Sequence, residues 1–287
     1  MTHPIELHPR RHVFHGHASG VAAHIRRPAD AVLEVKSSST LPVIGGHCES
    51  KVGRTKMGKW VSFQSAQTSA HGDYVSAAQG LATTRGKPFE EAATMTKVTA
   101  RVQGLTILGR VKIADLSLGM EARSAPGTAE PSIRLSGNNI EGVSIDGAKL
   151  NIKLADHIFK KYHTKKLLAE AFGRLPDRHK AMFLPCQTEN GDVYEFPESN
   201  GTVKATIVEK ISWDGKPHPE AQIYGNVVRV PGLGKIYFGE LFITGDARRL
   251  TIVRFQLGSD DGGEVTGGDG QTNGSIWPPP PPPPPGQ

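Results

Sequence analysis

The residues from Val98 to Leu154 alternate between apolar and polar side chains in a series of short runs, and this pattern limits the folds open to the chain. Apolar residues recur at every second position in these runs: Val98/Ala100/Val102, Leu105/Ile107, Val111/Ile113, Leu116/Leu118/Met120, Ile133/Leu135, Val143/Ile145 and Leu150/Ile152/Leu154. Successive side chains of a strand point to opposite faces of a sheet, so each run can bury one face. Glycines between the runs indicate turns. The predicted fold class is all-β, with mainly antiparallel sheets in a sandwich or barrel-like arrangement.

Residues 155–173 are the one segment with convincing helical periodicity. Apolar side chains recur at the spacing of one helix face, and four lysines line the other: Ile158, Phe159, Tyr162, Leu167, Leu168, Ala171 and Phe172 against Lys160, Lys161, Lys165 and Lys166. Asp156 provides an acidic start, and Gly173 and Pro176 provide an end. We expect one amphipathic surface helix laid across a sheet, although a basic helix of this kind can also bind a membrane or a partner.

The composition changes after residue 257, which suggests a boundary. Residues 1–257 are expected to form a β-rich globular region, with a split into two subdomains near 155–185 as an alternative. Residues 258–275 are rich in Gly and Asp and lack a core pattern, so we expect residues 258–287 to form an arm and tail. The tail holds Trp277 and then eight prolines, from Pro278 to Pro285, which favour a polyproline II rod. Such a rod either docks into a neighbouring copy or serves as a stiff spacer.

The charge distribution argues against some partners. The formal net charge is +6, but the basic residues are scattered and only 6% of residues are aromatic. Nucleic-acid binding needs a concentrated basic face with aromatic rings for stacking, so it is not expected. An anionic surface or a polysaccharide remains open as a partner. No apolar run approaches the roughly 18 residues that a membrane-spanning helix needs, and no secretory signal is visible at the N-terminus.

Histidines and cysteines are the candidate ligand residues. His15 and His17 would share one face of a strand, where two imidazoles with a further ligand can hold Zn²⁺ or Cu²⁺. Cys48 and Cys186 either form one disulfide that closes a long loop or are two buried thiols.

Motifs for catalysis are absent from the sequence. Neither a nucleophile elbow nor a zinc-protease, P-loop or dinucleotide pattern is present. Asp115 with Glu121, and Cys186 with His179, are the pairs that could form a carboxylate site or a thiol nucleophile. Because neither spacing is specific, we expect solvated acids and a buried thiol, and a protein without enzymatic activity or cofactor.

Several segments together resemble one bacterial family. They are Phe14-His-Gly-His-Ala-Ser-Gly-Val, Leu41-Pro-Val-Ile-Gly-Gly, the Gly- and Val-rich segment from Ala100 to Asp115, Leu135-Ser-Gly-Asn-Asn-Ile-Glu-Gly-Val-Ser-Ile-Asp-Gly and the segment from Gly225 to Leu241. This layout resembles that of choice-of-anchor P family proteins. The resemblance implies a secreted, cell-surface β protein with no catalytic residues to carry over. The chain departs from the pattern because no signal peptide or sortase anchor is visible.

These observations predict a non-enzymatic structural protein that self-assembles into a filament, tube or layer through sheet edges and terminal arms. Its partners would be copies of itself. The alternative is an extracellular carbohydrate- or matrix-binding module that exposes Trp60, Trp213 or Tyr224 on one face. We expect an extracellular or cell-surface location, with the cytoplasm left open.

Overall fold

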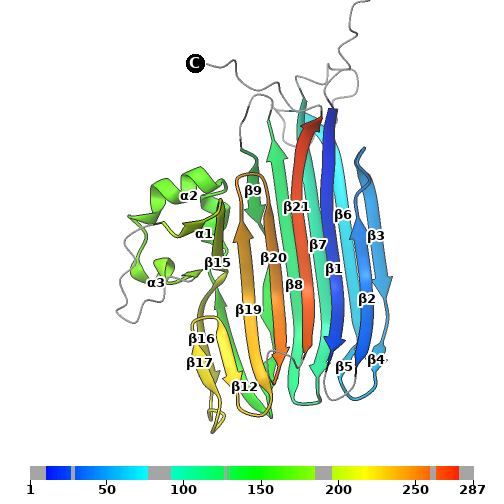
Figure 1. Ribbon diagram of the computed structural model, residues 1–287, viewed down its shortest axis with the longest axis vertical. Helices are drawn as coiled ribbons and strands as arrows, with labels where there is room; N and C mark the ends of the chain where they lie inside the picture. Colours follow the sequence, from blue (N-terminus) through cyan, green and yellow to red (C-terminus); the bar gives the residue numbers. More distant parts are fainter. Residues whose placement is uncertain are drawn as a thin grey trace, which may run out of the picture.

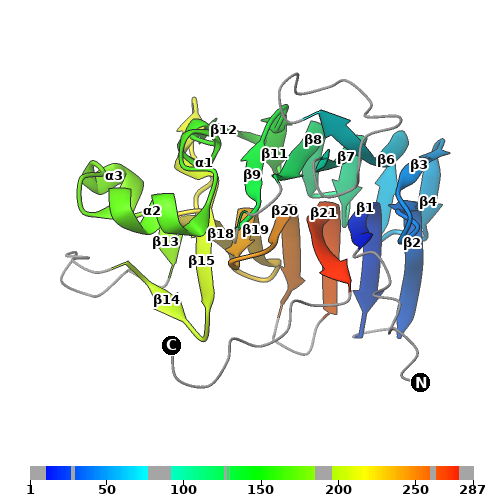
Figure 2. The same cartoon turned by 90° about the horizontal axis from the view of Figure 1, so that it is seen from above.

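The computed structural model describes residues 11–26, 30–76, 92–125, 128, 130–184, 196–258 and 263–277. In this part of the chain, two large antiparallel sheets pack face to face, and short helices lie at one side (Figures 1 and 2). The all-β prediction is confirmed.

The first sheet, sheet A, has ten strands among the described residues, with the main order β13-β15-β19-β20-β21-β1-β2. Its strands are β1 (Arg11–Ile25), β2 (Ala31–Thr40), β13 (Phe183–Leu184), β14 (Glu198–Ser199), β15 (Thr202–Thr206), β17 (Gln222–Tyr224), β18 (Val227–Val230), β19 (Gly234–Ile243), β20 (Arg248–Leu257) and β21 (Gly263–Trp277).

The second sheet, sheet B, has eleven strands in the described residues, with the main order β16-β12-β11-β8-β7-β5-β4. Its strands are β3 (Gly46–Val52), β4 (Thr55–Met57), β5 (Val61–Phe63), β6 (Ser65–Ser76), β7 (Ala92–Ile107), β8 (Val111–Ser124), β9 (Ser132–Leu135), β10 (Asn139–Glu141), β11 (Val143–Ile145), β12 (Ala148–Leu154) and β16 (Val208–Asp214). The strands β6 and β9 extend it beside β7 and β8.

The core lies between the sheets and is continuous. In β8 the period-two pattern buries Val111, Ile113, Leu116, Leu118 and Met120. The same cluster of buried side chains includes residues before, within and after the segment 155–185. The described residues therefore share one large core, and the alternative of a split into two subdomains is not seen in them.

The strand β21 corrects the expectation of an arm after residue 257. Residues 263–277 pair with β20 on one side and with β1 on the other, in the middle of sheet A. Gly267 and Gly270 face leucines of sheet B, and a Cβ atom at Gly270 would come within 2.8 Å of Leu118 Cδ2. The absence of side chains at these glycines lets the opposite leucines fill the space, so the strand is buried without an apolar pattern.

The predicted helix is interrupted. Among the described residues, α1 (His157–Lys161), α2 (Lys165–Phe172) and α3 (Asp177–Lys180) are the helices. The break occurs because Thr164 takes an extended conformation (φ −116°, ψ 157°) and its side chain accepts a hydrogen bond from the Leu167 amide, as an N-cap does. The buried residues Ile158, Phe159, Leu168 and Phe172 still form one apolar face against the core.

The strand β2 forms one edge of sheet A, and its backbone is irregular. The register with β1 shifts between Val21 and Ala23, and Ser37 has a positive φ of 62°. The Ser37 hydroxyl donates to the Ser50 carbonyl at 2.9 Å, which ties β2 to β3 in the other sheet. Bulges of this kind reduce the capacity of an edge to pair with another strand.

Candidate functional site

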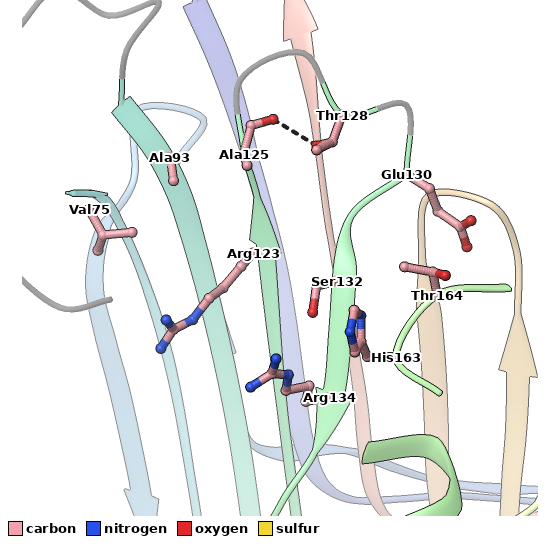
Figure 3. Close-up of a pocket in the computed structure, with 10 residues that line it drawn as sticks. All are labelled: Val75, Ala93, Arg123, Ala125, Thr128, Glu130, Ser132, Arg134, His163 and Thr164. Carbon is pink, nitrogen blue, oxygen red and sulfur yellow. Dashed lines mark hydrogen bonds between the residues drawn. The ribbon is translucent and has the colours of Figure 1, made fainter. Parts of the chain in front are cut away.

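A cavity of about 350 Å³ lies on the outer face of sheet B, where β8 and β9 meet the segment that joins α1 to α2. Figure 3 shows its lining, which is Val75, Ala93, Arg123, Ala125, Thr128, Glu130, Ser132, Arg134, His163 and Thr164. Arg123 lies directly opposite Ser132 in the pairing of β8 with β9, while the neighbouring Ala122 and Ile133 are buried in the sandwich. Alternation along the strands thus turns the polar residues outward, into the cavity.

Two arginines line the cavity, and one of them is already in an ion pair. Arg123 Nε donates to Glu121 Oε1 at 2.6 Å, which uses one side of that guanidinium. Arg134 is exposed and forms no ion pair with any described residue. Because a guanidinium carries five N–H donors in a planar fork, both arginines retain donors for a ligand.

The single acid in the described lining, Glu130, is already used by the protein. Its carboxylate accepts hydrogen bonds from the backbone amides of Lys165 and Lys166, the second at 3.2 Å. These amides belong to the first turn of α2, where an acidic group satisfies unpaired donors and complements the helix dipole. Glu130 therefore anchors α2 beside the cavity, with a carboxylate that keeps its negative charge.

Arg248 stabilises the part of the cavity lining that contains His163. This fully buried side chain of β20 donates to the Phe159 and Tyr162 carbonyls at 3.2 and 3.1 Å. Burial lowers the pKa of Arg248 to about 10, and Glu130 opposes the shift, so the guanidinium remains charged at neutral pH. It holds the end of α1, and with it His163, in place.

His163 lines the cavity, and one nitrogen of its ring lacks a hydrogen-bond partner among the described residues. Its Nδ1 is buried and has no hydrogen-bond partner among the described residues, while its carbonyl accepts from the Ile133 amide at 2.8 Å. Burial lowers the pKa of His163, the positive charges of Arg134 and Arg248 lower it further, and the negative charge of Glu130 opposes the shift. The ring is therefore neutral at pH 7, and an anion placed nearby would favour its protonated form.

The arrangement suits binding better than bond cleavage. Guanidinium groups, an imidazole and the hydroxyls of Thr128, Ser132 and Thr164 surround the cavity. Two hydroxyls are partly used, because Thr128 donates to the Ala125 carbonyl at 2.7 Å (Figure 3) and Thr164 caps α2. No hydrogen bond among the described lining residues joins a hydroxyl to His163, so the geometry shows no activated nucleophile.

The predicted histidine pair lies on the outer face of β1. His15 is exposed, and His17 is half-buried with Nε2 3.4 Å from the Ser38 hydroxyl. Within the described ranges, no group of three or more histidine, cysteine or acidic side chains is arranged to hold a metal ion. The described part of the chain thus provides no third protein ligand for His15 and His17.

The other predicted ligand and tail residues are only partly described. Cys48 is a free, half-buried cysteine on β3, and Cys186 lies outside the described residues, so the choice between a bridge and two thiols stays a prediction. Trp277 ends β21 opposite Arg11. Pro278 and Pro285 lie outside the described residues, so tail docking stays a prediction.

Of the two hypothetical catalytic pairs, the carboxylate pair does not form, and the pair of His179 with Cys186 stays untested because Cys186 lies outside the described residues. Asp115 and Glu121 point from the same face of β8 about 20 Å apart, at about 3.4 Å per residue, well beyond the separation of a glycosidase pair. Each acid instead pairs with an arginine, Asp115 with Arg101 at 2.8 Å and Glu121 with Arg123. His179 lies 3.9 Å from Glu209 Oε1 and beside the His157 ring.

The three candidate aromatic residues do not gather on one face. Trp60 and Trp213 are half-buried and pack against the core, and the Trp213 ring stacks on His218 with centroids 6.4 Å apart. Tyr224 is 52% exposed, on β17 of the other sheet. A carbohydrate site built from these three rings is therefore not formed.

Sequence reasoning did not identify the cavity residues. Arg134 occupies an outward position of a predicted strand and Arg123 follows another, where charged residues are ordinary, and His163 lies within a predicted helix. The one available signal is the conflict between helical periodicity and Thr164, a capping residue type in the middle of the predicted helix.

Comparisons with known proteins give a family but no activity. No curated protein matches the chain. Solved structures of outer membrane phospholipase A from Escherichia coli, one of them an active-site mutant at 11% identity, cover 95% of this chain and 93% of theirs with a TM-score of 0.16. The calcium-bound dimer from Salmonella typhi gives 11% identity, 95% and 94% coverage and a TM-score of 0.16. Likenesses at this TM-score carry no argument about this chain.

The helices of the described part are all too short or too polar to cross a membrane. The family model for the Domain of unknown function (DUF8256) matches residues 12–244, and the chain belongs to this family. The resemblance to choice-of-anchor P proteins stays a prediction.

Proposed function

We propose that this member of the DUF8256 family is a binding protein that holds an anionic group, such as a sulfate, phosphate or carboxylate, in the cavity between β8, β9 and His163. One observation carries the proposal. Arg134, which has no ion-pair partner among the described residues, lines the same cavity as the buried, unpartnered Nδ1 of His163. An anion would supply the missing partner to both groups.

The expected affinity is modest. A charge-assisted hydrogen bond contributes about 1.5 to 3 kcal/mol, and an arginine can hold a tetrahedral or planar anion with two bonds. Because ordering of the side chains and desolvation offset part of this gain, we expect a dissociation constant of roughly 0.1 to 1 mM for a free ion.

Calorimetric titration with sulfate, phosphate and acetate tests the proposal. Arg134→Gln should weaken binding at least about tenfold, which corresponds to 1.4 kcal/mol. Lys235→Gln is the matched control, since it removes one charge from an exposed position of β19 in sheet A. Equal affinities of the wild type and Arg134→Gln would contradict an anion site at this cavity.

The imidazole provides a second readout. Saturation with sulfate should raise the pKa of His163, measured by NMR of its ring protons, because a nearby negative charge favours the protonated form. A pKa that stays low at saturating sulfate would place the bound ion elsewhere.

Self-association is the second candidate function, and exposed aliphatic side chains on an edge strand favour it. Within the described residues β2 pairs with β1 alone, and Val32 and Val35 are 65% and 49% exposed. The irregular backbone of β2 opposes regular edge pairing, so we expect any association there to be weak. Light scattering of the wild type against Val32→Lys/Val35→Lys tests it, and a wild type that is monomeric at high concentration excludes it.

A further inference from the structure

A row of polar side chains crosses sheet B and ends at the cavity. Successive strand pairings align five residues across β3, β6, β7, β8 and β9, each directly opposite the next. They are His47, His71, Lys97, Glu121 and Arg134. We call this set the transverse row. Neighbouring strands lie about 4.8 Å apart, so the row extends about 19 Å over four strand spacings.

The transverse row lies on the outer face of the sheet. Directly paired residues share a face, and His47, Lys97 and Arg134 are exposed while His71 is half-buried. The residues that flank Lys97 along β7, Thr96 and Val98, are buried in the sandwich. The row is therefore a continuous surface feature and not a set of unrelated positions.

The row has a cationic character despite its one acid. Glu121 is bound by Arg123 at 2.6 Å, so its charge is compensated within the protein. Lys97 and Arg134 form no ion pair with any described residue, and the rings of His47 and His71 are in contact with centroids 6.0 Å apart. Glu49, 3.9 Å from His47, is the acid at the far end and also accepts from Gln67 at 2.6 Å.

We infer that the anionic group held in the cavity belongs to an extended acidic polysaccharide, whose further charges lie along the transverse row. This inference rests on the proposed function, since the cavity provides the anchoring site. Lys97 is the next cation along the row from Arg134, two strands away. From Lys97 the row continues through His71 and His47 to the edge formed by β3.

The chemistry beside the row favours a polysaccharide over a nucleic acid. The neighbouring register holds two hydroxyl groups, those of Ser69 and Thr99, which are joined at 2.6 Å between their oxygens. Such groups can exchange hydrogen bonds with sugar hydroxyls. The row contains no Phe, Tyr or Trp, the side chains on which single-stranded nucleic acids stack.

The test compares dextran sulfate fractions of increasing length with uncharged dextran and with free sulfate, by calorimetry at two salt concentrations. Affinity should rise with chain length until the row is covered, and fall as salt screens the charges. Lys97→Gln should weaken the long polymer about fivefold, the size expected of one exposed ion pair. It should leave sulfate binding unchanged, and Lys235→Gln should affect neither ligand.

The outcomes separate the inference from the proposed function. Failure of sulfate, phosphate and acetate alike to bind, or failure of their binding to respond to Arg134→Gln, overturns the proposed function. Sulfate binding without any gain from chain length, or without an effect of Lys97→Gln on the polymer, overturns the transverse row alone. Equal binding of uncharged dextran, or tighter binding of a single-stranded oligonucleotide of matched charge, overturns the assignment to an acidic polysaccharide.

Discussion

The strands β8 and β21 lie within the two sheets and pack against each other across the core, yet their sequences are opposites. β8 presents leucines and other large apolar side chains inward, whereas β21 presents glycines at the matching contacts. Leu118 of β8 lies against Gly270 of β21, so the leucine fills the space that both strands would normally share. A strand can therefore be central to a core because it lacks side chains, provided that its opposite strand supplies the volume.

The largest effect is expected where β8 supplies that volume. Leu118→Ala should leave a cavity that Gly270 cannot fill, and should lower the free energy of unfolding by about 3 to 5 kcal/mol. Urea denaturation followed by circular dichroism measures this loss. Leu167→Ala, at a 38% exposed position of α2, is the control. A loss below about 1 kcal/mol for Leu118→Ala would show that Leu118 does not fill the space left by the glycines of β21.

Acid should act on the neighbourhood of β21 and not on the inward face of β8. His12 is buried on β1 opposite Ile276, and burial lowers its pKa from 6.5 to about 4. The unfolded chain therefore binds the proton more tightly, so stability falls as pH falls from 6.5 to about 4. The loss reaches up to about 3 kcal/mol.

Denaturation midpoints between pH 7 and pH 4 measure this dependence. His12→Phe should flatten the profile over that window while remaining folded, since a ring still packs on Phe14. An unchanged profile in His12→Phe would assign the acid sensitivity to another group.

Adding a single methyl group to β21 tests whether Gly270 and Leu118 share one space in the core. Gly270→Ala should cost about 1 to 3 kcal/mol, because its Cβ would meet Leu118 Cδ2 at 2.8 Å. The double variant Gly270→Ala/Leu118→Ala should lose less stability than the sum of the two single losses, since the new methyl enters the cavity. Strict additivity in denaturant unfolding would show that the two residues do not share a space.

The smallest effect concerns the polar side of β21. Asp269 accepts hydrogen bonds from Arg249 at 3.1 and 3.2 Å and from the Thr251 hydroxyl at 2.7 Å, both on β20. Asp269→Asn should cost about 1 kcal/mol by weakening these bonds. Asp214→Asn, at an exposed position, is the control in the same melting experiment. Equal melting temperatures for the two variants would show that Asp269 does not fasten β21 to β20.

The sequence allowed the fold class to be predicted because most strands carry their own period-two signal. It also allowed local turns to be predicted: Asn200 and Gly201 have φ angles of 49° and 73° in the hairpin between β14 and β15, as an Asn-Gly turn requires. The strand β21 escaped prediction because glycine has no side chain to show a pattern.

The cavity could not be predicted for a different reason. Arg123 and Arg134 are brought together by the pairing of β8 with β9, and His163 joins them through the packing of α1 and α2. Each contact depends on tertiary structure that no single segment encodes. Only the cap at Thr164 left a local trace, as a residue type that interrupts a helix.

The pairing of β1 with β21 has a consequence for the time course of synthesis. Arg11 lies opposite Trp277, so the second strand of this pair emerges from the ribosome long after the first. Sheet A cannot be completed until β21 has been synthesised, and contacts between residues so far apart along the chain form slowly. The family model ends at residue 244, before both β20 and β21. In a chain cut at that boundary, β1 and β19 would each have an edge without a partner strand. These edges could pair with other chains that are being synthesised on the same messenger RNA.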